Sequence, residues 1–334
     1  MRLTRLLVLA AILALALIAA AACGGGGGAS TDRELRVGYA YGFDAGDVGD
    51  RVAFRELERE KGIRASFQEM GGGRNVVIAV ERGDIDVGNL VLLDAIRAVD
   101  QGVDLKAILV SNQVAEFVLV AANGVTSVEG LKGKTIAFGG QGDQTNALAS
   151  LLLQQAGVAE SDVGLVALPE STNRATALLA GRIDAAVIEF VDYLRISSQK
   201  PGFEILGSTK ETSPFPINTV YVVSGDFARK NPELVQDLVS GLLDGYERLY
   251  GPEGGKDWKA EAKATALEGE SDALVAKVYA FYRDVGFWPR RTGLVARADY
   301  DRGTEFWVET GQLERGVPFD RVWDLSFWRK AAEG

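Results

Sequence analysis

The pattern of apolar and polar residues after residue 33 changes repeatedly between the period of a strand and the period of a helix. Short polar or glycine-containing connections separate these segments. Such regular alternation indicates an α/β architecture with a mainly parallel sheet. The first predicted elements are a strand at Glu34–Tyr39, a helix around Arg55–Lys61, a strand at Ile63–Phe67, a helix at Asn75–Glu81, a strand at Ile85–Gly88 and a helix at Leu90–Val99.

The same order of elements occurs twice along the chain. The segment R-G-D-I-D-V at 82–87 is echoed by A-G-R-I-D-A at 180–185, an offset of 98 residues. The strand V-G-Y that starts at Val37 is echoed by I-A-F at Ile136, an offset of 99 residues. Helix starts near Asn75 and Arg174 also correspond. Anchors that agree this closely predict two similar α/β lobes in tandem, with chance similarity of short segments as the alternative.

Two extended segments are predicted to join these lobes as hinge strands. Glu116–Ala121 enters the second lobe, and Asn218–Val223 leaves it. The first lobe is therefore expected to be discontinuous, with residues 34–115 and 220–334, and the second lobe to span 116–219.

The sequence after the return crossing is mostly helical. Asn231 followed by Pro232 is typical of a helix start, because Asn caps well and Pro fits the first turn. The aromatic residues of this region recur at helical spacing, which predicts core packing. They are Tyr279, Tyr282, Phe306, Trp307, Trp323 and Trp328.

The beginning of the chain has the pattern of an export signal. Arg2 and Arg5 precede an apolar run from Leu6 to Ala22, and the next residue is Cys23, the only cysteine. This arrangement resembles a bacterial lipoprotein signal, which predicts a signal peptide at 1–22 and lipidation of Cys23. Residues 23–33, with five glycines, then form a flexible tether. An uncleaved membrane helix is the alternative.

Composition and charge exclude several functions. The net charge is −10, and removal of residues 1–22 takes away two basic and no acidic residues, which leaves −12. An acidic protein of this kind is a poor partner for nucleic acid. There is no histidine, and no cysteine after Cys23. Catalytic triads that use histidine, catalysis by a cysteine thiol and most transition-metal sites are therefore excluded. An oxygen-only calcium site stays open, although no D-x-D-x-D-G loop is present.

Several motifs together resemble one family. They are the opening V-G-Y loop, G-D-I-D-V-G-N, G-L-K-G-K-T-I-A at 130–137 and G-R-I-D-A-A-V-I-E. The chain is similar in these to the nitrate/sulfonate/taurine-type solute-binding proteins of ABC importers, a group that includes binders of thiamine-pyrimidine precursors. The resemblance covers about residues 34–330. It implies a type II periplasmic-binding-protein fold, a monomer without cofactor, and an ABC permease and ATPase as partners.

A ligand site is expected beyond the carboxyl ends of the strands, where open α/β sheets bind their ligands. Loops at these ends would form the facing walls of a cleft that closes as the lobes hinge. The candidates are Tyr39, Tyr41, Phe43, Asp44, Asn89, Gln141, Gly142, Asp143, Gln144, Thr145, Glu189 and Phe190. Each has a structural alternative: Asp143 and Thr145 could cap the helix predicted at Asn146–Ala156, and the aromatic rings could pack under the loop.

The charge of these loops favours a neutral or cationic ligand. Asp44, Asp143 and Glu189 would repel a sulfonate, whereas Tyr and Phe rings stack well on a nitrogen heterocycle. Arg74 or Arg174 would reverse this expectation if either reached the site. The predicted function is an extracytoplasmic, lipid-anchored solute-binding protein. A ligand-sensing lipoprotein that acts on a receptor, and a hydrolase that uses carboxylates such as Asp44 and Glu189, are the alternatives.

Overall fold

The computed structural model describes residues 33–122, 124–141, 143–209, 217–309 and 311–333. The predicted signal peptide and Cys23 lie outside these residues, as do Gly142 and most of the tether. Among the described residues, no helix is both long and apolar enough to cross a membrane.

The described strands of the first lobe form a five-stranded sheet in the order β2-β1-β3-β10-β4. β1 and β3 run parallel, whereas β10 runs antiparallel to both of its neighbours. The strands are β1 (Arg33–Tyr39), β2 (Ile63–Glu69), β3 (Val87–Val91), β4 (Leu105–Asn112) and β10 (Thr219–Ser224).

The second lobe repeats this arrangement in the order β7-β6-β8-β5-β9. β6 is parallel to β7 and β8, whereas β5 is antiparallel to β8 and β9. In each sheet, therefore, the fourth strand is one that comes from a crossing between the lobes, which confirms the predicted fold. The strands are β5 (Phe117–Ala121), β6 (Thr135–Phe138), β7 (Gly164–Ala167), β8 (Ala185–Glu189) and β9 (Glu204–Ser208).

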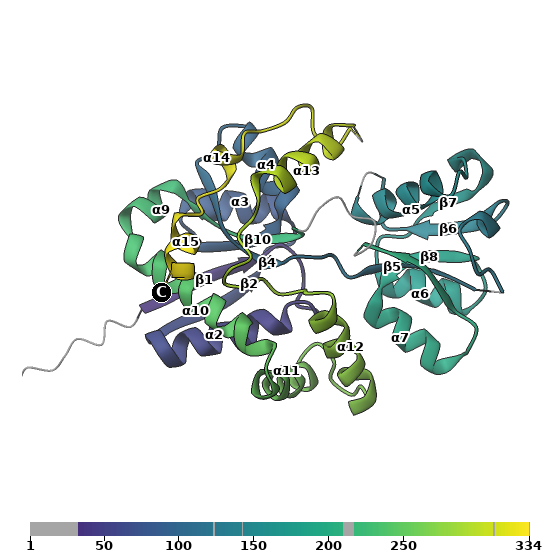
Figure 1. Ribbon diagram of the computed structural model, residues 1–334, viewed down its shortest axis with the longest axis horizontal. Coiled ribbons are helices and arrows are strands. Elements are labelled where there is room, and N and C mark those ends of the chain that lie inside the picture. Colours follow the sequence, from purple (N-terminus) through teal and green to yellow (C-terminus); the bar gives the residue numbers. More distant parts are fainter. Residues whose placement is uncertain (1–32, 123, 142, 210–216, 310, 334) are drawn as a thin grey trace, which may run out of the picture. The chain divides into compact units, whose positions relative to one another are not determined.

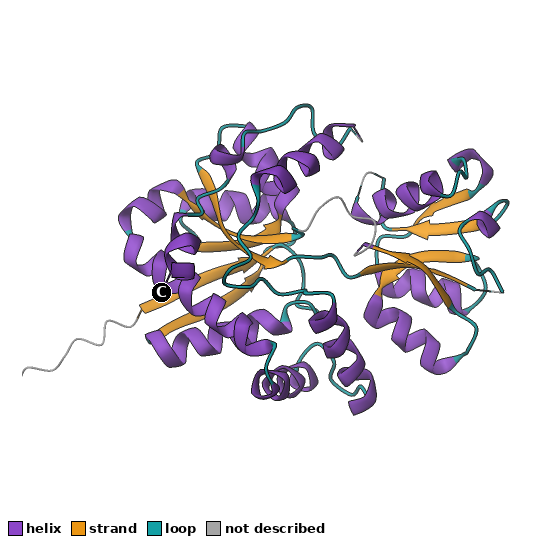
Figure 2. Ribbon diagram, viewed as in Figure 1, coloured by secondary structure: helices purple, strands orange, loops and turns teal. Residues whose placement is uncertain are grey.

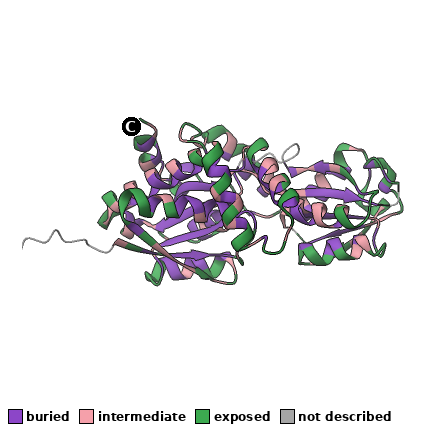
Figure 3. Ribbon diagram, turned by 90° about the horizontal axis from the view of Figure 1, so that it is seen from below, coloured by how far each residue is buried: buried purple, intermediate pink, exposed green. Residues whose placement is uncertain are grey.

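Helices cover both faces of each sheet, and the strands between them are mostly buried (Figures 1, 2 and 3). The second lobe contains α5 (Gln144–Gln155), α6 (Ser171–Leu179), α7 (Phe190–Gln199) and the short 3₁₀ turns η1 (Glu129–Leu131) and η2 (Glu160–Asp162). The first lobe contains α2 (Val48–Lys61), α3 (Gly73–Arg82) and α4 (Leu92–Asp100). The C-terminal region adds α9 (Gly225–Lys230), α10 (Pro232–Leu249), α11 (Pro252–Ala264), α12 (Asp272–Asp284), α13 (Arg297–Glu309), α14 (Phe319–Val322) and α15 (Ser326–Glu333).

The aromatic residues of the C-terminal region pack into the first lobe, as their spacing predicts. Tyr282, Trp323 and Trp328 are part of its buried core, and the partly buried Phe306 packs against it. Trp258 and Trp288, which lie among the same helices, are fully buried as well.

The repeated G-x-I-D motif begins as a turn, so the predicted strand at Ile85–Gly88 is shifted. Gly83 ends α3 in a left-handed conformation (φ 73°), and the amide of Ile85 still donates to the carbonyl of Ala79 in that helix. β3 consequently starts only at Val87. Gly181 has the equivalent left-handed conformation (φ 68°) at the end of α6.

The aspartates of the two motifs perform the same structural task. Asp86 Oδ2 accepts a hydrogen bond from the amide of Arg36 (2.9 Å), and Asp184 Oδ2 accepts one from the amide of Thr135 (2.9 Å). Each carboxylate thus joins the turn to the first parallel strand of its lobe. The repeated motif therefore supplies the same aspartate-to-backbone hydrogen bond in each lobe, and this bond connects a turn to a strand.

Close packing of α2 against α10 depends on glycines in α10. A Cβ atom at Gly245 would lie 2.4 Å from Ala53 Cα, and one at Gly241 would lie 2.5 Å from a methyl group of Leu57. The backbone of α2 therefore occupies the space where a side chain would be, and the helices cannot accommodate one without moving apart.

We expect Gly245→Ala to lower the free energy of unfolding by about 1–3 kcal/mol, because the added methyl group forces α2 and α10 apart. Urea unfolding would measure the change. Gly316→Ala is the matched control, since nothing lies within 4 Å of a Cβ at this exposed position. Equal stability of the two variants would contradict the close contact.

Candidate functional site

Three carboxylates from separate segments come together at the junction of the lobes. Asp44 lies in the loop after β1, Glu116 immediately before β5, and Glu189 is the last residue of β8. One carboxylate oxygen from each lies within 4.8 Å of the other two. We call these three residues the acidic cluster.

Strand pairing brings two members of the acidic cluster together. β5 and β8 are antiparallel, with Phe117 opposite Glu189. The amide of Phe190 also donates to the carbonyl oxygen of Glu116 (2.9 Å). Glu116 is therefore held beside Glu189 by the backbone, although the residues are distant in sequence.

The loop after β1 supplies the third carboxylate. Asp44 Oδ1 accepts a hydrogen bond from the amide of Gly46 (2.7 Å), and the amide of Asp44 donates to Asp47 Oδ2 (3.1 Å). These bonds fold the loop into a tight turn just before α2. Asp44 reaches solvent, whereas Glu116 and Glu189 are half-buried.

Burial and mutual repulsion make the acidic cluster difficult to ionise. Burial, followed by the charges of Asp44 and Asp192, raises the pKa of Glu189 to about 8. Burial and the charges of Asp44 and Glu189 hold the pKa of Glu116 well above its usual range. Surrounding protein atoms also raise the pKa of Asp44, even though part of its surface is exposed. Burial and like charge therefore both favour the protonated form of these carboxyl groups.

Asp192 is a further carboxylate near the acidic cluster. Its side chain is only 2% exposed, and Oδ1 accepts a hydrogen bond from Arg195 Nη1 (3.0 Å). The other oxygen, Oδ2, is buried and has no hydrogen-bond partner among the described residues. Arg195 also donates to Glu270 Oε1 (2.7 Å), so its charge is shared between two carboxylates.

Tyr39 belongs to a buried network around Asp50. Its hydroxyl donates to Asp50 Oδ2 (3.0 Å) and lies 3.0 Å from the hydroxyl of Tyr221. Tyr246 donates to Asp50 Oδ1 (2.6 Å). Burial raises the pKa of Asp50 to about 6, and the hydroxyl groups oppose this rise. Tyr39 is predicted to contact the ligand, but its hydroxyl group already has hydrogen-bond partners in the core.

Asn89 is also turned into the protein. It lies within β3, not after it, because the strand begins two residues later than the sequence indicates. Its side chain is 5% exposed and donates to Ser111 Oγ (2.9 Å). Gln141, by contrast, is exposed, and Gly142 lies outside the described residues.

Asp143 and Thr145 form the N-terminal cap of α5. Asp143 Oδ1 accepts hydrogen bonds from the amide of Asn146 (2.8 Å) and from the hydroxyl of Thr145 (2.6 Å). Gln144 reaches the return crossing, where its amide group donates to Asn218 Oδ1 (2.8 Å). The capping role that the sequence offers for Asp143 is therefore present.

Arg74 and Arg174, the two arginines that could make the charge of the site positive, differ in burial. Arg74 is exposed on α3. Arg174 is 2% exposed and donates to the carbonyl oxygens of Val187 (2.5 Å), Leu168 (2.7 Å) and Pro169 (2.7 Å). Arg174 therefore connects the end of β8 to the segment before α6 through hydrogen bonds. Its positive charge acts to lower the pKa of Glu189.

Two aromatic candidates, Tyr41 and Phe43, belong to the loop after β1. Tyr41 is 61% exposed, and the half-buried Phe43 packs against the core of the first lobe. The guanidinium group of Arg51 lies 4.8 Å from the ring centre of Phe43 and 4.0 Å from that of Phe67. Arg51 is thus a cation beside the loop that the sequence analysis does not identify.

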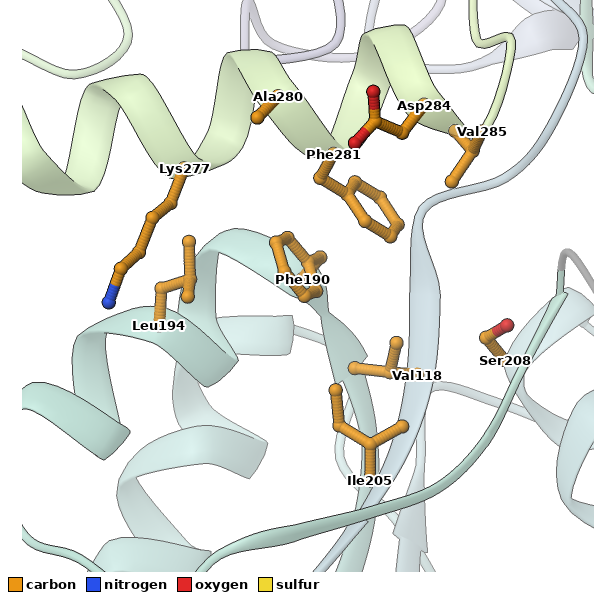
Figure 4. Close-up of a pocket in the computed structure, with 10 residues that line it drawn as sticks. All are labelled: Val118, Phe190, Leu194, Ile205, Ser208, Lys277, Ala280, Phe281, Asp284 and Val285. Carbon is orange, nitrogen blue, oxygen red and sulfur yellow. The ribbon is translucent and has the colours of Figure 1, made fainter.

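Phe190 forms a contact between the lobes. Its ring stacks on Phe281 of α12, with centroids 3.9 Å apart and planes 13° from parallel. The stack borders a pocket of about 450 Å³ between α7 and α12, with Lys277 and Leu194 at one side (Figure 4). Two successive residues therefore have different surroundings: Glu189, the last residue of β8, belongs to the acidic cluster, whereas Phe190, the first residue of α7, borders this pocket.

Sequence reasoning does not identify Glu116, Asp47, Asp50 or Asp192 as parts of the acidic surroundings. A signal is present for two of them, because Asp44, Asp47 and Asp50 are three residues apart and flank the start of α2. Glu116 has no local signal, since its position depends on the pairing of β5 with β8.

Comparisons with known proteins identify relatives. The model of the NMT1/THI5-like family matches residues 59–253. The taurine-binding periplasmic protein of Escherichia coli K12 is 25% identical over 63% of this chain, and the match spans 65% of that relative. The periplasmic aliphatic sulphonate-binding protein of Escherichia coli shares the fold, with a TM-score of 0.67 at 22% identity, over 87% of this chain and 97% of that one. The nitrate-binding protein of Synechocystis PCC 6803 has a TM-score of 0.67 at 11% identity, over 91% and 89%.

The raised pKa of Glu189 makes the stability of the protein depend on pH. Between about pH 4.5 and 8 the folded state holds a proton that the unfolded state has lost, so stability falls as pH rises through this range. The slope is at most about 1.4 kcal/mol per pH unit, because the two states differ by one proton, and the solvent contact of Glu189 makes it smaller. Urea unfolding should show a smaller loss between these limits for Glu189→Gln and an unchanged loss for the exposed control Glu268→Gln. Identical pH profiles for all three proteins would contradict the raised pKa.

Proposed function

The chain belongs to the NMT1/THI5-like family, and from this premise we propose that it is the solute-binding component of an ABC importer. In this role it captures a small organic solute outside the cytoplasm and delivers it to a permease and ATPase complex. The similarity to the taurine-binding protein of Escherichia coli, which spans 65% of that relative, supports the proposal.

The observation that carries the proposal is a site assembled from both lobes. Asp44 comes from the first lobe, Glu189 from the second, and Glu116 from the segment that connects them. A solute that contacts all three holds the lobes together, and its departure frees them. Closure about two crossing segments is the usual way in which binding proteins signal occupancy.

The proposed solute is small and contains nitrogen or sulfur. The loop that carries Asp44 also holds two aromatic side chains, the exposed Tyr41 and the half-buried Phe43, which offer surfaces for a flat or methylene-rich ligand. We propose binding rather than catalysis because the three relatives named above are all described as binding proteins. A receptor-linked sensor would use the same site, and only its outer partner would differ.

The proposed location is the outer face of the cell membrane. The basic flank, the apolar run and Cys23 at the start of the sequence support export and lipidation. The tether at 23–33 would let the protein reach its permease, and we propose that it acts as a monomer.

Solute binding is tested by thermal unfolding of the full-length protein against a panel of small solutes. A solute at about 100 times its Kd should add about 2.7 kcal/mol to the stability of the folded state, which raises the melting temperature. The panel contains alkanesulfonates, nitrate, amines, polyamines and pyrimidines. If no solute class raises the melting temperature, the proposed function is wrong.

The lipid anchor is tested separately by Cys23→Ala in the producing cells. We expect the unaltered protein to fractionate with membranes and the variant to appear in the soluble exported fraction, because a lipid chain is the only proposed attachment. The variant should bind the same solute with the same affinity, since residue 23 precedes the two lobes. Membrane association that survives the substitution would contradict the anchor.

A further inference from the structure

We propose that the acidic cluster binds a protonated nitrogen of the solute, so that the substrate class is an organic amine in its ammonium form. This inference rests on the proposed function, because it assigns a chemical class to the same site. It gives the cluster a specific partner, which neither family membership nor fold supplies.

The geometry of the acidic cluster suits an ammonium group. Such a group carries three N–H donors, and Asp44, Glu116 and Glu189 provide three acceptors whose oxygens lie within 4.8 Å of one another. A nitrogen placed about 2.8 Å from each oxygen, the usual length of a charge-assisted bond, requires oxygens about 4.6 Å apart. The observed spacing therefore allows one nitrogen to contact all three.

Two buried carboxylate oxygens have no hydrogen-bond partner among the described residues. They are Glu116 Oε2, which has almost no solvent-accessible surface, and Asp192 Oδ2, whose side chain is 2% exposed. The Tyr282 hydroxyl hydrogen-bonds to the Glu116 carboxyl group, and this bond acts to lower the pKa of Glu116. The charge of Asp192 raises the pKa of both Glu116 and Glu189, so this carboxylate is close enough to the acidic cluster to act on it electrostatically. Buried acceptors in folded proteins are nearly always paired, so the missing donors point to a ligand.

Gly46 leaves room between the carboxylates. A Cβ atom at this position would lie 3.1 Å from Asp44 Oδ1, 3.3 Å from Glu116 Oε2 and 3.3 Å from Phe287 Cζ. The space is thus bounded by two anionic oxygens and the edge of an aromatic ring. A methylene group next to an ammonium fits such a mixed surface, whereas a calcium ion requires six to eight oxygen ligands.

Positive charge from the protein does not neutralise the acidic cluster fully. Arg195 is shared between Asp192 and Glu270, and Arg174 is occupied by backbone carbonyl groups. Charged and titratable groups surround the acidic cluster on several elements. They are Asp47 from the loop, Asp50 and Arg51 from α2, Arg174 from α6, Asp192 and Arg195 from α7, and Tyr282 from α12. Acidic groups therefore outnumber basic ones around the site.

Proton release distinguishes an amine from an anion as the ligand. Burial raises the pKa of Glu189 to about 8, so this carboxyl holds a proton at neutral pH in the empty protein. An ammonium group binds the ionised form, and its binding must release that proton. Affinity for an amine should consequently rise with pH, by up to about tenfold per pH unit for each proton released. A sulfonate bound at the same carboxyl groups would not release protons.

The test is isothermal titration calorimetry of the full-length protein with matched ligand pairs. The pairs are putrescine and 1,4-butanediol, taurine and isethionate, and an aminomethylpyrimidine and its hydroxymethyl analogue. We expect an amine to bind at least about tenfold more tightly than its amine-free partner, the equivalent of one lost charge-assisted contact. Buffers of different ionisation enthalpy should reveal proton release on binding.

Substitutions then assign the binding to the cluster. Glu189→Gln removes one charge, and Gly46→Ala fills the space without a change of charge; each should weaken amine binding at least about tenfold. Glu268→Gln, at an exposed position in the turn between α11 and α12, should leave amine binding unchanged. Melting curves of the variants verify that each is folded, and Glu189→Gln is expected to fold well because it relieves repulsion.

Four outcomes overturn the inference. Equal affinity for both members of each pair, or tight binding of ethanesulfonate or nitrate, would leave solute binding intact and reject the ammonium class. Binding of calcium or magnesium alone that Glu189→Gln abolishes would make the cluster a metal site. The absence of binding by every compound would reject both this inference and the proposed function.

Discussion

The exclusion of water from carboxylates at the junction of the lobes is the constraint on which the properties of the site depend. Burial is the largest cause of the raised pKa values of Glu116, Glu189 and Asp50. Around Asp50 the protein supplies tyrosine hydroxyl groups, and the carboxylate is satisfied internally. At Glu116 and Asp192, one oxygen of each carboxyl group has no partner among the described residues. The two groups of acids therefore differ in their partners: Asp50 is satisfied within the core, whereas the junction leaves acceptors unpaired in this part of the chain.

The antiparallel strands keep these acids in place. β10 and β5 each occupy the fourth position of their sheet. In the first sheet β1 pairs with β3 in parallel, and in the second sheet β6 pairs with β7 and β8 in parallel. β5 sets Glu116 beside Glu189, and β10 contributes Tyr221 to the hydroxyl network around Asp50. Hydrogen bonding of the crossing segments thus determines both the architecture and the electrostatics of the junction.

Local patterns predict much of the fold, because the spacing of apolar residues and the residues at turns indicate where its helices and strands lie. The repeat, the two crossings and the helical C-terminal region are all visible in the sequence. The start of β3 is misplaced because a left-handed Gly83 delays the strand while Ile85 remains bonded to α3. Asp44 and Glu189 can be proposed from their positions after strands. Glu116 cannot, since only the register of β5 against β8, a long-range pairing, makes it their neighbour.

The pairing at the crossings has a consequence for the engineering of the chain. Asn112 and Thr219 are paired where β4 meets β10, and the amide of Asn218 donates to the carbonyl of Asn112 (3.0 Å). Within the second sheet, Val118 of β5 is opposite Ser208 of β9. The segment that leaves the first sheet after Asn112 is therefore adjacent to the segment that returns to it at Asn218. A tight turn from Asn112 to Asn218 would reseal the first lobe, and a ligand-responsive lobe from a related protein could be grafted at the same joint.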